Sequence, residues 1–178
     1  MVDDRPTPML YLDLDGTVRH GKDELGRWVN GPDDVVIFPE AVEMMRRWKD
    51  GGGRIVGVSN QGGIALGYLS DEMCCAAMMR TQELADGLFD KIAWCGHHPQ
   101  AVHPEMARCW CRKPAPGLLI GAALSMSAIR GEIYPPYMAL MVGDRPEDQE
   151  CARIADIDFT WAAEWRSQAT TGTVRRIR

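Results

Sequence analysis

Short apolar runs alternate along this chain with longer segments in which apolar residues recur at helical spacing. The apolar runs predict buried strands at Met9–Leu12, Arg54–Val58, Phe89–Trp94 and Ala139–Val142. The helical segments run from Pro39 to Lys49, from Ser70 to Ala85, from Pro116 to Ser125 and from Pro146 to Ala155. Strands that alternate with helices favour a parallel sheet with helices on both faces. The pattern therefore predicts an α/β fold, a doubly wound parallel sheet.

Residues that start or stop regular structure support these boundaries. Gly51–Gly53 stops the first helix, and Ser70 and Pro116 are suitable helix starts. Between Val18 and Asn30 the sequence is polar and contains glycine, which predicts a hairpin or flap beside the end of the first strand. We see no insertion that could form a large cap domain.

Chain length sets the domain organisation. A chain of 178 residues is long enough for one well-buried core and too short for two ordinary domains with a large lid. We therefore expect one domain over residues 1–165. Residues 166–178 are polar and end in an arginine-rich segment, so we expect a loosely held tail there.

Composition narrows the possible partners. The net charge of −5 at pH 7 gives no general attraction to polyanions, which disfavours a nucleic-acid substrate. The sequence shows no signal peptide and no apolar stretch of about 18 residues, so we expect a cytoplasmic protein with no membrane span. A monomer is the simplest expectation.

Two aspartates close the first predicted strand. Asp13 and Asp15 are separated by Leu14, and side chains in a strand repeat with a period of two, so both carboxylates start on the same side. Two such carboxylates repel each other unless a cation lies between them or one holds a proton. Taken alone, this motif is most often a turn.

Polar residues also follow the other strands. Ser59 and Asn60 offer a hydroxyl and an amide suited to phosphate oxygens, and the alternatives are a turn cap for Ser59 and left-handed backbone for Asn60. The run 143–148, which contains Asp144 and Asp148, is a second acidic cluster. Ligands of open parallel sheets bind at the carboxyl ends of strands, so we expect these residues on one edge.

Four soft metal ligands lie in two close pairs, Cys95 with His97 and Cys109 with Cys111. Thiolate and imidazole ligands in this arrangement can close a tetrahedron around Zn²⁺ with no open position. This indicates a structural zinc site that holds a loop in place. The alternative is a set of buried thiols without a metal.

Two details of this loop stay open. His98 or His103 could replace His97 as the fourth ligand. Arg112 and Lys113 follow the last cysteine directly, so the zinc loop would aim these two cations at an anion.

Together these motifs resemble the haloacid dehalogenase superfamily of phosphatases. Its four signatures are matched by residues 13–17, 59–60, 113 and 143–148. The Cys-x-His and Cys-x-Cys-Arg-Lys-Pro motifs are similar to those of the zinc-loop phosphatases, which include histidinol-phosphate phosphatase and heptose 1,7-bisphosphate phosphatase. The resemblance runs to about Trp161. These enzymes often carry Arg where this chain has Leu14, a departure that bears on the substrate.

The resemblance implies a Mg²⁺-dependent phosphomonoester hydrolase. Asp13 would attack phosphorus to form an aspartyl-phosphate, and Asp15 would protonate the leaving group and later deprotonate water. Mg²⁺ would bind between Asp13 and Asp144, with the backbone carbonyl of Asp15 as a further ligand.

The remaining residues have supporting roles under this resemblance. Lys113, Ser59 and Asn60 would surround the phosphoryl oxygens. Asp148 would orient Lys113 or metal-bound water. Arg112 would grip a second phosphate or a carboxylate, or form a surface salt bridge.

The expected substrate is a small phosphorylated metabolite of carbohydrate metabolism, with a sugar phosphate or bisphosphate first and histidinol phosphate second. Two alternatives remain at this stage. One is a polynucleotide 3′-phosphatase, and the other is a non-catalytic phosphoacceptor or zinc-dependent binding module.

Overall fold

The computed structural model describes residues 6–23 and 28–171 of the chain. A five-stranded parallel sheet forms its centre, with the strand order β5-β4-β1-β6-β7. The strands are β1 (Met9–Leu12), β4 (Arg54–Asn60), β5 (Lys91–Cys95), β6 (Ala139–Gly143) and β7 (Asp158–Trp161). The predicted fold class is confirmed, and β7 is a strand that the apolar pattern did not predict.

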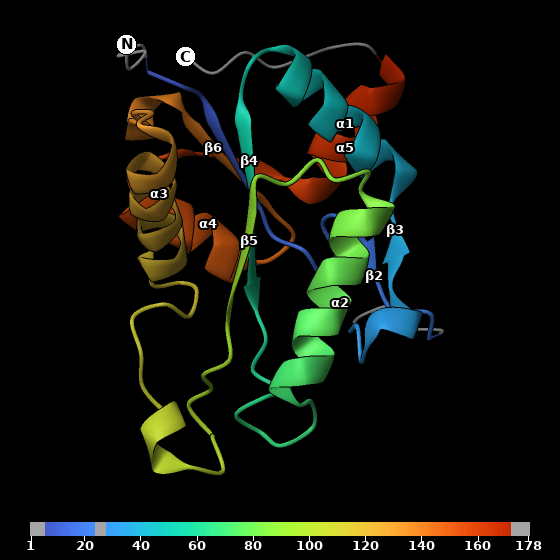
Figure 1. Cartoon of the computed structure of the whole chain (residues 1–178), viewed down its shortest axis with the longest axis vertical. Helices are drawn as coiled ribbons and strands as arrows, with labels where there is room; N and C mark the ends of the chain where they lie inside the picture. The colour runs from blue at the N-terminus through green and yellow to red at the C-terminus, as the bar shows by residue number, and fades with distance from the viewer. Residues whose placement is uncertain (1–5, 24–27, 172–178) are drawn as a thin grey trace.

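Helices cover both faces of this sheet (Figure 1). One face carries α1 (Pro39–Asp50), α2 (Asp71–Leu84) and α5 (Ala162–Thr171), and the other carries α3 (Gly117–Arg130) and α4 (Pro146–Ile154). Short 3-10 turns lie at Pro32–Asp34, Pro104–Met106 and Pro136–Met138. No cap domain is present in the described part of the chain. None of the described helices has the length and hydropathy that a membrane-spanning segment requires.

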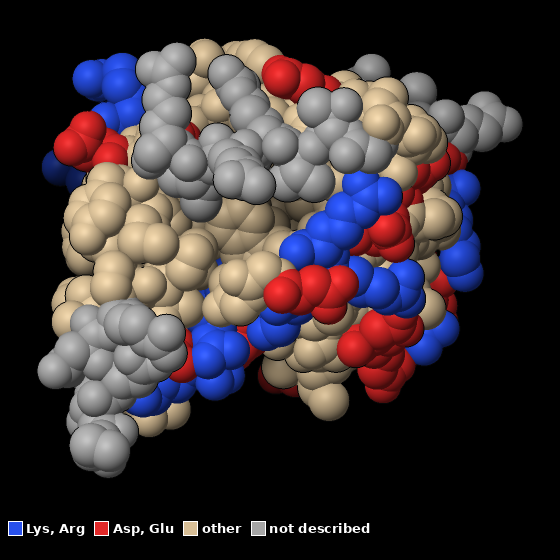
Figure 2. Space-filling view, turned by 90° about the horizontal axis from the view of Figure 1, so that it is seen from above, with Lys and Arg blue, Asp and Glu red and all other residues tan. Residues whose placement is uncertain are grey.

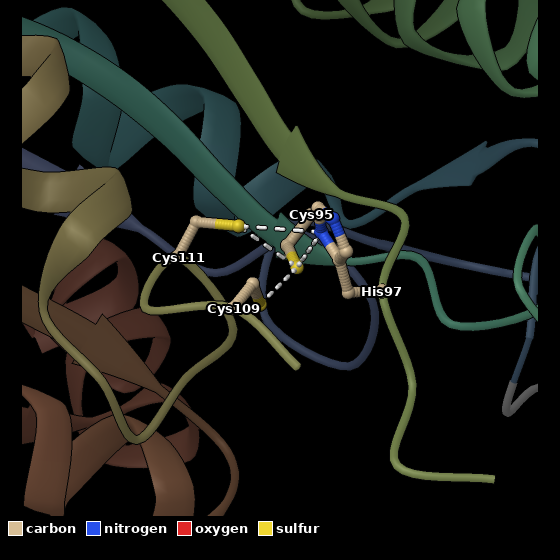
Figure 3. A group of neighbouring side chains, drawn as sticks. All are labelled: Cys95, His97, Cys109 and Cys111. Atoms are coloured by element: carbon tan, nitrogen blue, oxygen red, sulfur yellow. Dashed lines mark hydrogen bonds between the residues drawn. The ribbon is translucent and has the colours of Figure 1, made fainter. Parts of the chain in front are cut away.

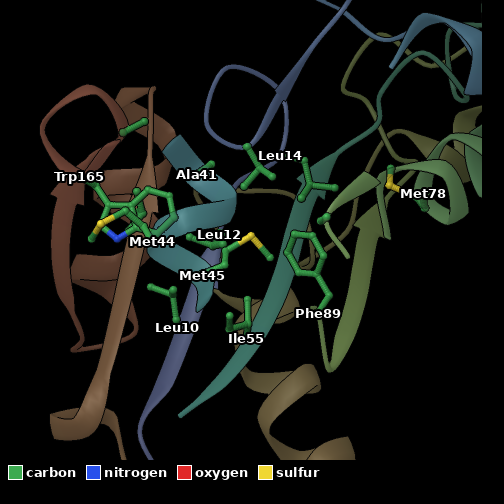
Figure 4. Close-up of a cluster of buried hydrophobic side chains, with 14 of the residues drawn as sticks. Leu10, Leu12, Leu14, Ala41, Met44, Met45, Ile55, Met78, Phe89 and Trp165 are labelled. Carbon is green, nitrogen blue, oxygen red and sulfur yellow. The ribbon is translucent and has the colours of Figure 1, made fainter. Parts of the chain in front are cut away.

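The period-two alternation of β1 divides the core into two layers. Leu10 and Leu12 face the first group of helices, where they pack with Met45 of α1 and Trp165 of α5 (Figure 4). Met9 and Tyr11 point to the opposite side and belong to the cluster that α3 and α4 cover. A strand with both faces buried reads as a continuous apolar run. This is why the first motif follows an uninterrupted apolar segment.

Local signals define the helix ends. The hydroxyl of Ser70 accepts a hydrogen bond from the Met73 N–H and caps α2. Pro39 occupies the first turn of α1, where a missing N–H costs nothing. α3 continues beyond the predicted end at Ser125 and stops at Gly131, whose positive φ of 69° suits glycine.

The predicted flap begins with a short antiparallel hairpin. β2 (Arg19–His20) pairs with β3 (Val36–Ile37), and an isolated bridge joins Asp15 to Arg19. The flap therefore starts beside the first acidic motif, as expected. Residues 24–27, including Gly26, lie outside the described residues.

The expected tail is corrected by α5. This helix runs through Thr171, so a boundary after residue 165 falls inside it. Arg47 of α1 donates to the Gln168 and Ala169 carbonyls, which ties the two helices together. The prediction of a loose tail is thus wrong for residues 166–171, and residues 172–178 lie outside the described residues. The polar composition of this segment suggested a loose tail, but the outer side of a surface helix is polar as well.

Charges of both signs cover the surface at the amino ends of the strands. Figure 2 views this side from above and shows the blue and red side chains intermixed. Ion pairs such as Arg54–Glu132 and Lys49–Asp90 account for part of this mixture. The described charges on this face therefore do not form the single-sign patch that attracts a polyanion.

We predict that Arg166→Met destabilises the protein. The Arg166 guanidinium donates to the carbonyls of Gly16 and Thr17 and lies 4.1 Å above the Phe38 ring, so its loss leaves buried acceptors unpaired. The expected loss of unfolding free energy is about 1.5–3 kcal/mol, measured by urea denaturation. Arg153→Met is the control, because Arg153 only pairs with Glu150 on the surface. An equal drop in the urea midpoints of Arg166→Met and Arg153→Met would contradict the prediction.

Candidate active site

The acidic motifs meet at the carboxyl edge of the sheet, where β1, β4 and β6 end side by side. Gly16 lets the chain turn there with a positive φ of 91°. A Cβ at residue 16 would lie 2.2 Å from Asp144 Oδ2, so only glycine allows this approach. The glycine of the first motif thus makes room for the aspartate of the last.

Lys113 lies at the centre of this edge. Its ammonium donates to Asp13 Oδ1 at 2.5 Å and to the Val58 carbonyl at 3.0 Å, and it pairs with Asp148 Oδ1 at 2.7 Å. Lys113 is only 3% exposed, so these charges interact with little screening by water. Burial alone would lower the pKa of Lys113, but the charges of Asp13 and Asp148 raise it above its ordinary value. The charged form of Lys113 is therefore favoured.

Asn60 holds the backbone of Lys113 in place. Its Nδ2 donates to the Lys113 carbonyl and its Oδ1 accepts from the Lys113 N–H, both at 3.0 Å. Asn60 also lines the cavity described below. The Asn60 amide pairs with the N–H and the carbonyl of Lys113 as a backbone strand would. This pairing supports a role for Asn60 in positioning Lys113 more directly than a role in binding phosphate.

Asp15 and Ser59 share a small polar network. The Gln61 side-chain nitrogen donates to Asp15 Oδ2 and to Ser59 Oγ, each at 2.7 Å, and Ser59 Oγ lies 3.4 Å from Asp15 Oδ2. All three side chains are nearly buried and line the same cavity. Sequence reasoning placed Ser59 and Asp15 here but missed the role of Gln61. Its position directly after Ser59–Asn60 was the available signal.

Three carboxylates at this edge suit a hard cation. The oxygens of Asp13, Asp144 and Asp148 lie within 4.8 Å of one another. Burial raises the pKa of Asp13, with partial opposition from Lys113, and burial together with Asp148 raises the pKa of Asp144. One ammonium cannot balance three converging carboxylates. A divalent cation with oxygen ligands, such as Mg²⁺, fits this excess of negative charge.

The carboxylate set differs from the sequence prediction at one residue. Asp13 and Asp144 are together as expected, and Asp148 joins them while also contacting Lys113. Asp148 also accepts from the Arg145 N–H at the start of α4, which fixes its rotamer. Leu14, between the two aspartates, is fully buried in the apolar core and is not among the residues that line the cavity.

The four predicted zinc ligands are also brought together (Figure 3). Sulfur–sulfur distances are 3.2 Å from Cys111 to Cys95 and 3.6 Å from Cys95 to Cys109, and His97 Nδ1 lies 3.5 Å from both Cys95 and Cys111. Ligands about 2.0–2.3 Å from a tetrahedral zinc would be roughly 3.5–3.8 Å apart. The donor set fits Zn²⁺, and three of the four distances fall in this range, while the Cys95–Cys111 distance is shorter.

The other two histidines lie outside this cluster. His98 Nδ1 accepts from the Gln100 N–H, and its ring lines the cavity. His103 is exposed and lies 4.0 Å from Glu105. His97 is thus the histidine that the fold groups with the cysteines.

A cavity of about 380 Å³ opens over the acidic edge. Its polar wall includes Asp13, Lys113, Arg112 and Arg145. Arg112 donates to the His97 carbonyl at 3.0 Å, so its guanidinium is anchored on the zinc loop as it faces the cavity. Arg112 therefore adds a cation to the lining of the cavity in addition to Lys113.

Another part of the cavity lining is apolar and comes from the flap and from the loop after β4. It includes Trp28, Val29, Leu66 and Leu69. The Trp28 ring lies 4.5 Å from the guanidinium carbon of Arg145, so the flap contacts the start of α4 at the cavity. The contact between Trp28 and Arg145 was not predicted. The sequence around an aromatic residue in a loop does not indicate which distant residue it will contact.

Comparison with known proteins identifies the family. No protein-family profile matches the chain. The D-glycero-beta-D-manno-heptose-1,7-bisphosphate 7-phosphatase of Photorhabdus laumondii is 34% identical over 156 residues, which cover 84% of this chain and 77% of that protein. The Escherichia coli K12 enzyme of the same name is 32% identical over 159 residues, covering 86% of this chain and 77% of that protein. This chain belongs to that family of haloacid dehalogenase phosphatases.

Solved structures show the same fold. A HAD-like protein of Mesorhizobium loti superposes with a TM-score of 0.75 at 24% identity, covering 97% of this chain and 90% of that chain. The D,D-heptose 1,7-bisphosphate phosphatase of B. bronchiseptica, complexed with magnesium and phosphate, gives a TM-score of 0.69 at 23% identity, covering 86% of this chain and 79% of that chain. The predicted enzyme class, a phosphoric monoester hydrolase, is confirmed by the family relationship.

We predict that removing zinc loosens the loop before it affects the core. Without a metal, the thiolates of Cys95, Cys109 and Cys111 repel one another, and the loop that leads into Lys113 loses its anchor. Chelation should raise KM for a phosphate ester and speed amide exchange in residues 97–111, while exchange in β1 stays slow. Restoring zinc should reverse both changes. Unaltered kinetics after verified zinc loss would show that the metal does not position Lys113.

Proposed function

We propose that this phosphatase hydrolyses a small phosphorylated metabolite through an aspartyl-phosphate on Asp13, with Mg²⁺ as cofactor. The supporting observation is the buried contact between Asp13 and Lys113, with Asp144 beside it. A carboxylate with one oxygen bound to an ammonium keeps its other oxygen for phosphorus. Of the two Asp13 oxygens, Oδ2 accepts only the weaker 3.3 Å contact from Thr17 among the described residues.

The side chains then divide the tasks of the reaction among themselves. Asp13 forms the bond to phosphorus, and Asp15 gives a proton to the leaving oxygen and takes one from the attacking water. Lys113 and the Ser59 hydroxyl neutralise and bind the phosphoryl oxygens. Asp13, Asp144 and Asp148, with the backbone carbonyl of Asp15, would hold Mg²⁺. The ion supplies positive charge against the transferring phosphoryl group.

The favoured substrate is a sugar phosphate or bisphosphate resembling heptose 1,7-bisphosphate. Two observations support this substrate class. The similar proteins are named as heptose bisphosphate phosphatases, and the Arg112 guanidinium is anchored on the cavity wall. A bisphosphate would place one phosphate on Lys113 and the other on Arg112. Histidinol phosphate is second, since it offers no second phosphate for Arg112.

We predict that Asp13→Asn abolishes turnover and leaves the fold intact. Asparagine fills the same space and can still accept from Lys113, but its amide is not a nucleophile. Phosphate release from p-nitrophenyl phosphate, with and without Mg²⁺, is the measurement, and thermal unfolding reports the fold. Asp50→Asn, an exposed aspartate at the end of α1, is the matched control and should keep full activity. Undiminished activity of Asp13→Asn would exclude the covalent mechanism.

We predict that Arg112→Ala raises KM for a sugar bisphosphate far more than for the matching monophosphate. The loss of a charge-assisted hydrogen bond to the second phosphate corresponds to an increase on the order of tenfold or more. Arg108→Ala is the control, because Arg108 is exposed on the same loop and does not line the cavity. Equal effects of Arg112→Ala on both substrates would remove Arg112 from substrate selection.

The same screen should include a 3′-phosphorylated oligonucleotide. Preference for it over every sugar phosphate would favour the polynucleotide 3′-phosphatase alternative. The acidic net charge and the compact cavity stand against that outcome.

A further inference from the structure

Arg19 is the largest side chain among those that are fully buried in the described structure. It begins the flap on β2, four residues after Asp15. Its guanidinium contacts Asp15 with two nitrogens: Nε donates to Oδ1 at 2.8 Å, and Nη2 donates to Oδ2 at 3.3 Å. The third nitrogen, Nη1, points to α2, where it donates to Thr81 Oγ1 at 2.7 Å and to the Ala77 carbonyl at 3.3 Å.

Stability alone does not account for this arginine. Desolvating a guanidinium and a carboxylate offsets much of their attraction, and apolar residues of similar volume often replace a buried ion pair without loss. The surroundings of Arg19 are apolar enough for such a replacement, because Met78 and Leu14 lie in the core cluster beside it. The specific feature is that its partner, Asp15, lines the cavity.

The contacts divide the two oxygens of Asp15 into different roles. Oδ2 accepts from Gln61, from Arg19 Nη2 and from Ser59, so its acceptor positions are filled. Oδ1 accepts only from Arg19 Nε among the described residues. A carboxylate oxygen has about two acceptor positions. One position of Oδ1 is therefore free to carry a proton while the other still binds Arg19.

We propose that Arg19 is a positioning residue that fixes the Asp15 carboxylate against α2 so that Oδ1 faces the leaving oxygen of the substrate. This inference rests on the proposed function, in which Asp15 transfers the proton. Thr81 and the Ala77 carbonyl hold the far end of the guanidinium, so α2 is the support for the whole arrangement. The planar fork keeps its hold on Asp15 in either protonation state.

The two chemical steps place different demands on this group. In the first, an Asp13 oxygen bonds to phosphorus, the bond from phosphorus to the leaving oxygen breaks, and the proton of Asp15 moves to that oxygen. In the second, a water oxygen bonds to phosphorus, the bond to Asp13 breaks with its electrons returning to the carboxylate, and a water proton moves to Asp15. A weakly basic leaving group needs no proton in the first step.

Leaving-group dependence tests the proposal. Arg19→Met keeps most of the volume but cannot bind Asp15. Turnover of glycerol 2-phosphate, which has a strongly basic leaving group, should fall on the order of 100-fold or more, the lower range of general acid–base catalysis. With p-nitrophenyl phosphate, a rapid burst of about one p-nitrophenolate per active site should survive, followed by slow steady-state release.

Two further variants separate positioning from folding. Arg19→Lys keeps the charge but replaces the planar guanidinium with a compact ammonium. Its turnover of glycerol 2-phosphate should lie between that of wild type and that of Arg19→Met. Thr81→Val removes the support on α2 with little change in volume. It should show a smaller version of the same difference between the two substrates, and it provides the test if Arg19→Met does not fold. Arg47→Met, an arginine that joins α1 to α5 away from the cavity, should lower stability and leave both activities unchanged.

Two results would overturn the proposal. One is an equal loss of the first-step rate on both substrates in Arg19→Lys and Thr81→Val, with no p-nitrophenolate burst retained, which is what a purely structural arginine gives. The other is wild-type behaviour of these two variants on glycerol 2-phosphate. Failure of the proposed function itself would look different, because wild-type protein would then release no phosphate in a manner that depends on Asp13.

Discussion

The buried ammonium of Lys113 is the interaction on which the active-site edge depends. It lies between Asp13 and Asp148, and the first of these is 100 residues away in the sequence. An unpaired carboxylate in this position would be costly to bury, and two of them would also repel each other. The segment that carries Lys113 must therefore return to the same point above β1 in every folded molecule.

Separate parts of the chain hold the Lys113 segment in this position. Asn60 binds both backbone groups of Lys113 and so connects it to the end of β4. The Cys and His cluster holds the loop that immediately precedes it. On the other side, a Cβ at Gly143 would lie 2.3 Å from the Cβ of Asp148, so glycine is needed for α4 to begin close to the strand. The Cys and His cluster, the Asn60 amide and Gly143 all act on the position of one ammonium.

The flap and the last helix hold the first acidic motif from the opposite side. Arg19 binds Asp15 from beneath, and Arg166 of α5 binds the carbonyls of Gly16 and Thr17. Both arginines use backbone or carboxylate acceptors that belong to the turn after β1. A turn held by two guanidinium groups from distant elements has little freedom, which is what proton transfer at a fixed distance requires.

The sequence alone was sufficient for the alternation of strands and helices, the edge where the acidic motifs meet, and the grouping of Cys95, Cys109 and Cys111 with a histidine. These follow from local periodicity and from ligand types at close spacing, both of which can be read along the chain. Only the tertiary structure decided which histidine joins the cysteines, that Asp148 joins the carboxylates, that α5 extends through Thr171, and that Arg19 binds Asp15. Sequence could not show these, because a charged residue in a short strand is expected to face water, and its buried partner on α2 lies 62 residues away. Packing between distant elements, which has no signature in local composition, determines where such a side chain points.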